Sequence, residues 1–226
     1  MWLARLLAWL SGVWSFGSPR RTARLLHGFA CTEQQSQLEL REAARRCPDD
    51  RRQGLYLRHA LDEARHARAF AEQAAELSRA SGGAALARAA ADSERLYERH
   101  GEARFLGLVA RGERRGRVEF EVYAGLLRRR GQLSLAELFE GLVRDERQHE
   151  AYTAQRLDEL CGSAGARRAW RYAARSEAWR AFRDRGRRFA GALYGVAMFV
   201  LYLALAPYAL AFRALHGRRS GFSSEP

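Results

Sequence analysis

Two short stretches of the chain carry the same pair of residue types at the same spacing, and both types are common metal ligands. The first is Glu63-Ala-Arg-His66, and the second is Glu146-Arg-Gln-His149. Residues three apart lie on one face of a helix, so each pair directs a carboxylate and an imidazole toward the same point. A single Glu-x-x-His pair arises often by chance, but two pairs on separate amphipathic helices form a much more specific pattern.

Each pair needs one more glutamate, from a further helix, to complete half of a site for two metal ions. Glu33 lies 30 residues before Glu63, and Glu113 lies 33 residues before Glu146, so the two half-sites have a similar layout. We therefore predict six metal ligands: Glu33, Glu63, His66, Glu113, Glu146 and His149.

Some of these assignments have alternatives, and other polar residues lie close to the ligands in sequence. Glu39 is an alternative to Glu33, and Glu119 or Glu121 is an alternative to Glu113. Three neighbours of the ligands are expected to support the site, although the sequence does not determine which way they face: Asp62, Asp145 and Arg147. Three histidines have no partner at ligand spacing and are predicted to be ordinary residues: His27, His59 and His100.

The predicted set of four carboxylates and two imidazoles indicates a redox-active pair of ions. Carboxylate oxygens can span two ions and offset their charge, while each imidazole binds one ion. This mixture suits iron or manganese better than copper or a structural zinc. The set also leaves positions open for O2, peroxide or water. The expected cofactor is therefore two iron ions, with manganese as the alternative.

Apolar residues at helical spacing predict four long helices that would position these ligands. The predicted helices cover residues 20–46, 50–80, 102–130 and 134–161. All six ligands fall on the apolar faces of these helices, where a carboxylate is costly unless it is paired or binds a metal ion. The Ala-rich segment 84–100 is predicted to be a helical crossover between the two halves.

Capping residues and glycines predict where these helices begin and end. Ser18-Pro19 is typical of an N-cap followed by the first helical position, and Asp49 or Asp50 is a good N-cap for the next helix. Ser134-Leu-Ala-Glu137 has the pattern of a capping box, which predicts the start of the fourth helix. Breaks are predicted at three glycine-containing places, which are residues 81–83, residue 131 and residues 161–165.

Composition limits the kinds of protein that this chain can be. With 226 residues it fits one domain plus additions. All basic residues are arginine, and the net charge of +13 favours anionic partners such as lipid headgroups. No zinc-finger spacing and no RNA-binding motif is present, so no nucleic-acid partner is predicted. Three scattered cysteines without a C-x-x-C pair argue against a disulfide framework and indicate a reducing compartment.

Residues 1–16 form an apolar stretch whose spacing predicts an amphipathic helix. It contains three tryptophans, and indole rings are favoured at membrane interfaces, so we expect the helix to lie on a membrane surface. Packing on the bundle or on a second subunit is the alternative. A signal peptide is disfavoured, because Arg5 is its only charge and no small-residue cleavage site precedes Ser18-Pro19.

A basic segment and then an uncharged segment follow the predicted bundle. Residues 189–212 contain no charge and would form about 36 Å of helix, enough to cross a hydrocarbon core of about 30 Å. A buried helix in a dimer is the alternative. The denser arginine cluster precedes this span, so the positive-inside rule places the bundle in the cytoplasm. The predicted organisation is a helix at 1–17, a bundle at 18–162, a basic helix at 163–188, a transmembrane helix at 189–212 and a tail at 213–226.

Several motifs resemble those of the ferritin-like superfamily, and most closely those of its rubrerythrin branch. Phe29-Ala-Cys-Thr-Glu33 is similar to the rubrerythrin first-helix motif, and Gly112-Glu113 with Asp145-Glu-Arg-Gln-His-Glu150 is similar to the second half. The resemblance covers about residues 20–161. It implies an all-α, ferritin-like four-helix bundle with a long crossover, a di-iron centre with the six ligands above, and a homodimer.

The chain departs from the rubrerythrin pattern in two respects. Gly116 stands where rubrerythrins carry a further glutamate, and no rubredoxin domain is present to supply electrons. Both departures disfavour peroxide reduction of the rubrerythrin type. The demethoxyubiquinone hydroxylases, a membrane-bound di-iron family that acts on a lipid-phase substrate, are similar in their Glu and Glu-x-x-His logic.

These features lead to three hypotheses about function. The preferred one is a membrane-anchored di-iron oxidoreductase that activates O2 or peroxide, uses an external electron donor, and acts on a substrate that is either soluble or dissolved in the membrane. The second is iron oxidation or peroxide detoxification of the rubrerythrin kind. The third is a non-catalytic, membrane-attached scaffold, which would bind no metal.

Overall fold

The computed structural model describes residues 2–216, which are mostly helical and contain no strand, so the prediction of an all-α protein is confirmed. The helices are α1 (Trp2–Ser15), α2 (Pro19–Arg46), α3 (Asp50–Ala80), α4 (Leu96–His100), α5 (Glu102–Arg129) and α6 (Leu133–His216). The chain divides into two compact units, residues 1–174 and residues 175–226.

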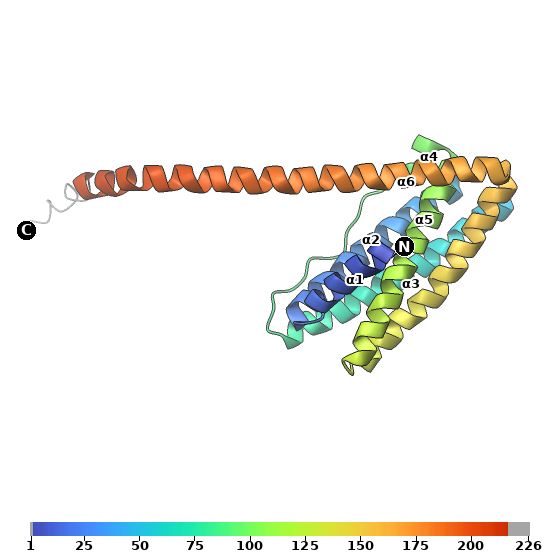
Figure 1. The fold of residues 1–226 in the computed structure, drawn as a ribbon, viewed down its shortest axis with the longest axis horizontal. Helices are drawn as coiled ribbons and strands as arrows, with labels where there is room; N and C mark the ends of the chain where they lie inside the picture. Colours follow the sequence, from blue (N-terminus) through green and yellow to red (C-terminus); the bar gives the residue numbers. More distant parts are fainter. Residues whose placement is uncertain (1, 217–226) are drawn as a thin grey trace, which may run out of the picture. The chain divides into compact units, whose positions relative to one another are not determined.

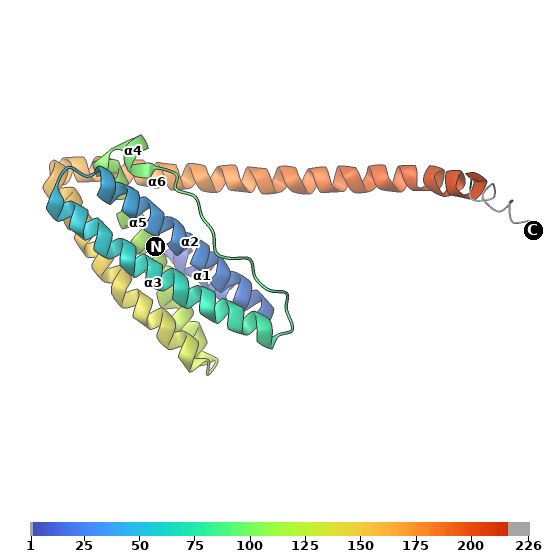
Figure 2. The ribbon, with the colours of Figure 1, turned by 180° about the vertical axis from the view of Figure 1, so that it is seen from behind.

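Four long helical segments lie side by side in the first unit: α2, α3, α5 and the part of α6 that precedes Gly162 (Figures 1 and 2). At Gly162 the backbone has a φ of 64° and a ψ of 170°, which is not helical, so α6 consists of two helices joined at a kink. Glycine adopts this conformation without the steric penalty of a side chain. The predicted break within residues 161–165 is therefore confirmed.

The core of the bundle consists of two apolar clusters with the predicted ligands between them. The larger cluster joins aromatic rings from all four helices: Phe29, Phe70, Phe120, Tyr123 and Phe139. The second cluster also draws on all four helices: Leu40, Tyr56, Phe105 and Leu157. On α3, Glu63 and His66 lie between Tyr56 and Phe70, and the order is equivalent on the other helices. The ligands thus form one polar layer between two dry clusters.

The predicted starts of the first two bundle helices are confirmed. Pro19 is the first residue of α2 and follows Ser18, whose extended backbone marks it as the N-cap. Asp49 caps α3, because its side chain accepts a hydrogen bond from the backbone N–H of Arg52 at 2.8 Å. The two helix starts fix how far Glu33 and Glu63 lie from the N-terminal ends of α2 and α3.

The predicted capping box at the start of the fourth helix is wrong. α6 begins at Leu133, so Ser134 lies inside its first turn. The backbone N–H of Ala136 donates to Gln132 O at 3.0 Å, which means that helical hydrogen bonding starts before Ser134. The tight turn at Gly131, with a φ of 70°, allows the helix to begin this early.

The crossover between α3 and α5 is irregular up to α4, so the predicted helix over residues 84–100 is wrong except for its last turn. The segment follows α2: Arg20 donates to Ser81 O at 3.1 Å, and Glu39 accepts from the backbone N–H of Leu96 at 2.8 Å. That part of α2 is about 28 Å long, whereas a helix of residues 81–96 would span only about 22 Å. The crossover must be extended to reach the start of α5.

α1 packs one face on α5 and exposes the other. Gly12 lies so close to α5 that a Cβ at this residue would come within 2.9 Å of the Tyr123 ring. The opposite face carries exposed apolar side chains: Trp2, Leu3, Leu7, Trp9, Leu10 and Trp14. The predicted helix is confirmed, and the alternative of packing on the bundle accounts for one of its faces. Contact of the exposed face with a membrane stays a prediction.

Among the described residues, one helix is long and apolar enough to cross a membrane by length and composition, and the relevant stretch lies in the C-terminal half of α6. The uncharged residues 189–212 are helical, as predicted. None of this apolar window is buried against other parts of the protein. The predicted tail from residue 217 onward lies outside the described residues.

Candidate metal centre

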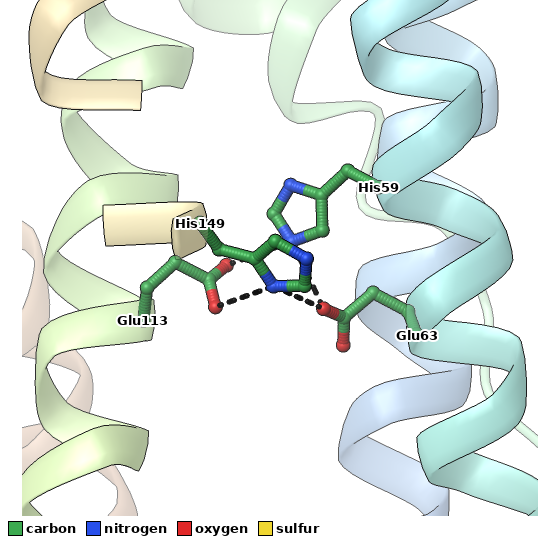
Figure 3. Close-up of side chains that lie close together, drawn as sticks. All are labelled: His59, Glu63, Glu113 and His149. Carbon is green, nitrogen blue, oxygen red and sulfur yellow. Dashed lines mark hydrogen bonds and ion pairs between the residues drawn. The ribbon is translucent and has the colours of Figure 1, made fainter. Parts of the chain in front are cut away.

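The six predicted ligands converge in the polar layer of the bundle, where they and His59 form two groups of four residues. Within each group the ligand atoms all lie within 4.8 Å of one another. Position 1 denotes the group Glu33, Glu63, His66 and Glu146. Position 2 denotes the group His59, Glu63, Glu113 and His149, which Figure 3 shows. Every member is buried, and Glu63 belongs to both groups. The arrangement therefore offers two adjacent cation positions that share one carboxylate.

Both predicted histidine ligands direct Nδ1 at carboxylates. His66 Nδ1 lies 4.0 Å from Glu63 Oε1 and 3.9 Å from Glu146 Oε1. His149 Nδ1 lies 3.4 Å from Glu63 Oε1 and 3.9 Å from Glu113 Oε2. Neither nitrogen makes a hydrogen bond, although both are buried. A buried polar atom without a partner is costly, and a cation held by the nitrogen and the carboxylates removes that cost.

The other nitrogen of each ring contacts the aspartate that directly precedes the Glu-x-x-His motif on the other helix. His66 Nε2 lies 3.1 Å from Asp145 Oδ2, and His149 Nε2 lies 3.2 Å from Asp62 Oδ2. Arg65 bridges the pair, because it donates to Asp62 and also lies 3.8 Å from Asp145. An Nε2–H that donates to a carboxylate leaves the lone pair on Nδ1, which is the tautomer that binds a metal ion at Nδ1.

Burial controls the protonation of the ligands. It raises the pKa of Glu63 and of Glu146 well above the usual value, and the neighbouring carboxylates add to the shift. Burial also raises the pKa of Glu33. The same loss of hydration lowers the pKa of His149 and lowers that of His59 to about 3, so these rings are neutral at neutral pH. In the absence of a cation these shifts favour the protonated form of Glu33, Glu63 and Glu146, and a bound metal ion would displace the protons.

The glutamates that were alternatives to the predicted ligands have other partners. Glu39 accepts hydrogen bonds from the crossover. Glu119 accepts one from Tyr123 OH at 2.7 Å, and Glu121 accepts one from Arg147 at 2.9 Å. None of these three carboxylates belongs to either cation position. Arg147 therefore pairs with a glutamate outside both positions, whereas the aspartates that were expected to support the site contact its histidines.

His59 is a member of position 2 that was predicted from the sequence to be an ordinary residue. Its Nε2 lies 2.9 Å from Glu63 Oε1 and 3.4 Å from Glu113 Oε1. His59 precedes Glu63 by four residues, which places both on one face of α3, and this spacing could have identified it. The other two histidines so classified lie elsewhere: His27 Nε2 is 2.8 Å from Ala87 O, and His100 Nδ1 is 3.0 Å from Tyr172 OH.

A comparison with protein-family models, with curated proteins and with solved structures found no match for this chain. The case for a metal centre therefore depends on the geometry of the chain's own residues. The metal-ligand role of the six predicted residues stays a prediction, which the following experiments test.

Replacing either supporting aspartate is expected to weaken metal binding by about 10- to 100-fold. Asp62→Asn and Asp145→Asn each remove the negative charge that favours Nε2–H and holds the ring. Calorimetric titration of the metal-free protein with Mn(II) measures the effect. Asp158→Asn, on the exposed side of α6, is the matched control and should bind like the wild type. Unchanged affinity in both site variants would remove the aspartates from the metal centre.

Proposed function

We propose that this protein is a membrane-anchored di-iron oxidoreductase whose bundle has the ferritin-like arrangement. The observation that carries the proposal is the pair of buried nitrogens, His66 Nδ1 and His149 Nδ1, that face carboxylates and make no hydrogen bond. The buried acids Glu63 and Glu146, whose pKa values are raised, lie beside imidazole nitrogens, and this arrangement fits two divalent cations because their charge offsets that of the carboxylates.

A bound pair of iron ions would supply the redox chemistry, in which O2 or peroxide is reduced and a substrate is oxidised. Glu63 would be shared by both ions, and the aspartates would keep the histidine rings in the orientation that binds them. The apolar clusters on either side of the polar layer keep bulk water away from the carboxylates. The residues thus provide a dry, rigid cage of the kind that such chemistry needs.

One difference from the rubrerythrin pattern favours an enzyme that oxidises a substrate over a peroxidase of the rubrerythrin type. A Cβ at Gly116 would lie 3.6 Å from Glu146 Oε2, so this residue directly borders position 1. Glycine places no carboxylate there, and four glutamates remain.

The membrane part of the proposal is supported by two features. The C-terminal half of α6 contains an apolar stretch long enough to span a bilayer, and α1 exposes a tryptophan-rich face. Arginines are dense before the apolar stretch, which favours a cytoplasmic location of the bundle. An enzyme held in this way has access to a substrate dissolved in the membrane and to a membrane-associated electron donor.

The proposal is tested with full-length protein extracted from membranes by detergent and stripped of metals. Anaerobic addition of Fe(II) should load about two ions per chain, in line with the two cation positions. Admitting O2 should then oxidise the bound iron and change the optical spectrum. Glu119→Gln is the matched control, because this carboxylate lies outside both positions and should leave loading and oxidation unchanged.

Each other outcome points to a different function. A wild-type protein that binds neither Fe(II) nor Mn(II) at micromolar concentration would overturn the proposal and leave the scaffold hypothesis. Oxidation of Fe(II) far beyond two ions per chain, without an organic substrate, would indicate iron oxidation as the function. Recovery of the protein in the soluble fraction without detergent would overturn the membrane part alone.

A further inference from the structure

His59 occupies a place in position 2 that the two Glu-x-x-His motifs do not account for. It is 1% exposed, and its Nε2 faces Glu63 and Glu113 at 2.9 Å and 3.4 Å. Its ring also lies against the His149 ring in a tilted arrangement, with centroids 3.7 Å apart and an interplanar angle of 33° (Figure 3). Two imidazoles from α3 and α6 therefore reach the same carboxylates from the same side.

The opposite nitrogen of His59 is held by a tyrosine from α6. His59 Nδ1 lies 2.6 Å from Tyr152 OH. A tyrosine oxygen can accept a hydrogen bond from Nδ1–H, which leaves the lone pair on Nε2 and directs it into position 2. His66 and His149 instead bind their aspartates through Nε2 and direct Nδ1 inward. His59 thus also has an outer hydrogen-bond partner, which is a hydroxyl instead of a carboxylate, and the roles of its two nitrogens are exchanged.

From this geometry we infer that His59 is a third histidine ligand, bound through Nε2 to the ion in position 2, and that Tyr152 is its positioning residue. The inference rests on the proposed metal centre and adds to it. Position 2 then offers two nitrogens and two carboxylates, whereas position 1 offers one nitrogen and three carboxylates. The two ions are therefore chemically unequal.

Unequal donor sets have consequences for loading. Imidazole favours later transition metals, and carboxylate favours harder ions such as Mn²⁺. Position 2 should therefore discriminate more strongly than position 1 in favour of Fe²⁺ or Co²⁺ over Mn²⁺. A mixture of metals should place the harder ion in position 1.

An ordinary buried histidine would satisfy the same contacts in another way. Tyr152 OH would donate to Nδ1, and Nε2–H would donate to Glu63, with no bond to a metal ion. Glutamine at residue 59 retains a polar amide that can make such hydrogen bonds but is a poor metal ligand. His59→Gln therefore separates a ligand from a structural residue, and His27→Gln is a matched control because His27 contacts a backbone carbonyl.

Two measurements on the detergent-purified, full-length protein test the inference. The first is a calorimetric titration of the metal-free protein with Co(II). The second counts the histidine nitrogens coupled to the one-electron-reduced di-iron form by pulsed electron paramagnetic resonance. The wild type should bind two Co(II) ions in unequal steps and show three coupled nitrogens. His59→Gln should weaken one step at least 10-fold and show two nitrogens. Tyr152→Phe should retain three nitrogens and weaken the same step by about 10-fold.

The possible failures are distinguishable. A wild type that binds neither Co(II) nor Fe(II) contradicts the proposed function as a whole. A wild type that binds two ions but shows two coupled nitrogens overturns the His59 inference alone, and this result does not depend on whether any variant folds. Unchanged Co(II) affinity in a folded His59→Gln protein would lead to the same conclusion.

Discussion

Replacing Glu63 by alanine is expected to remove both metal ions from the protein. Glu63 is the carboxylate that positions 1 and 2 have in common, and its side chain is 1% exposed. Losing a residue that only supports a ligand costs about 10- to 100-fold in affinity, so losing a shared ligand should cost more than about 100-fold at each position. Glu33→Ala and Glu113→Ala each affect one group and should retain one ion. Metal content after gel filtration measures all three results.

Glu39→Ala is the matched control for this series. Glu39 is also a buried glutamate of the bundle, at 4% exposed, but its oxygens accept hydrogen bonds from the crossover and lie outside both positions. Its loss should leave two ions bound while lowering the free energy of unfolding by about 1–3 kcal/mol, because backbone N–H groups of the crossover lose a charged acceptor. Retention of both ions by Glu63→Ala would refute the shared-carboxylate arrangement.

The buried carboxylates are expected to make the metal-free protein less stable as pH rises. The pKa values of Glu33, Glu63 and Glu146 are raised in the folded state above their ordinary value of 4.5, so the folded protein binds more protons than the unfolded chain. The free energy of unfolding then decreases with pH from about 4.5 up to the raised pKa values. A tenfold difference in proton affinity between the folded and unfolded states corresponds to about 1.4 kcal/mol.

The histidines have the opposite effect, but only at lower pH. The folded-state pKa values of His59 and His149 are lowered, so their contribution to stability is present above about 6.5 and is lost in acid. From about one pH unit above 6.5 both rings are neutral in the unfolded chain as well, so these two histidines no longer contribute to the slope. Urea unfolding at several pH values, with chelator and with saturating Mn(II), measures it.

Bound metal should reverse this dependence. Protons compete with Mn(II) for the same oxygens, so affinity rises with pH and the loaded protein becomes more stable where the metal-free protein becomes less stable. Glu63→Gln removes one of the raised carboxylates and should flatten the slope in chelator. A slope in chelator that is the same in the wild type and in Glu63→Gln would contradict the protonation states derived from burial.

The sequence by itself predicted the four long helices of the bundle and most residues of the candidate site. Asp49 caps α3 through a contact with Arg52, and Pro19 is the first residue of α2, so both helix starts depend on neighbouring residues alone. Helical periodicity likewise places Glu63 with His66, and Glu146 with His149, on one face without any knowledge of the fold. The long uncharged stretch near the C-terminus is also a property of composition alone.

Only the tertiary structure decided between the predicted ligands and their alternatives. Glu39 and Glu119 are also glutamates, but Glu39 accepts a hydrogen bond from the crossover and Glu119 accepts one from Tyr123. The conformation of the crossover also depends on the tertiary structure, because the distance that it must span along α2 requires an extended chain. The packing of α3 against α6 brings Asp145 to His66 and Asp62 to His149. The place of His59 in position 2 depends on the same packing. Spacing along one helix does not specify that relation, because it is set by packing between helices that are distant in sequence.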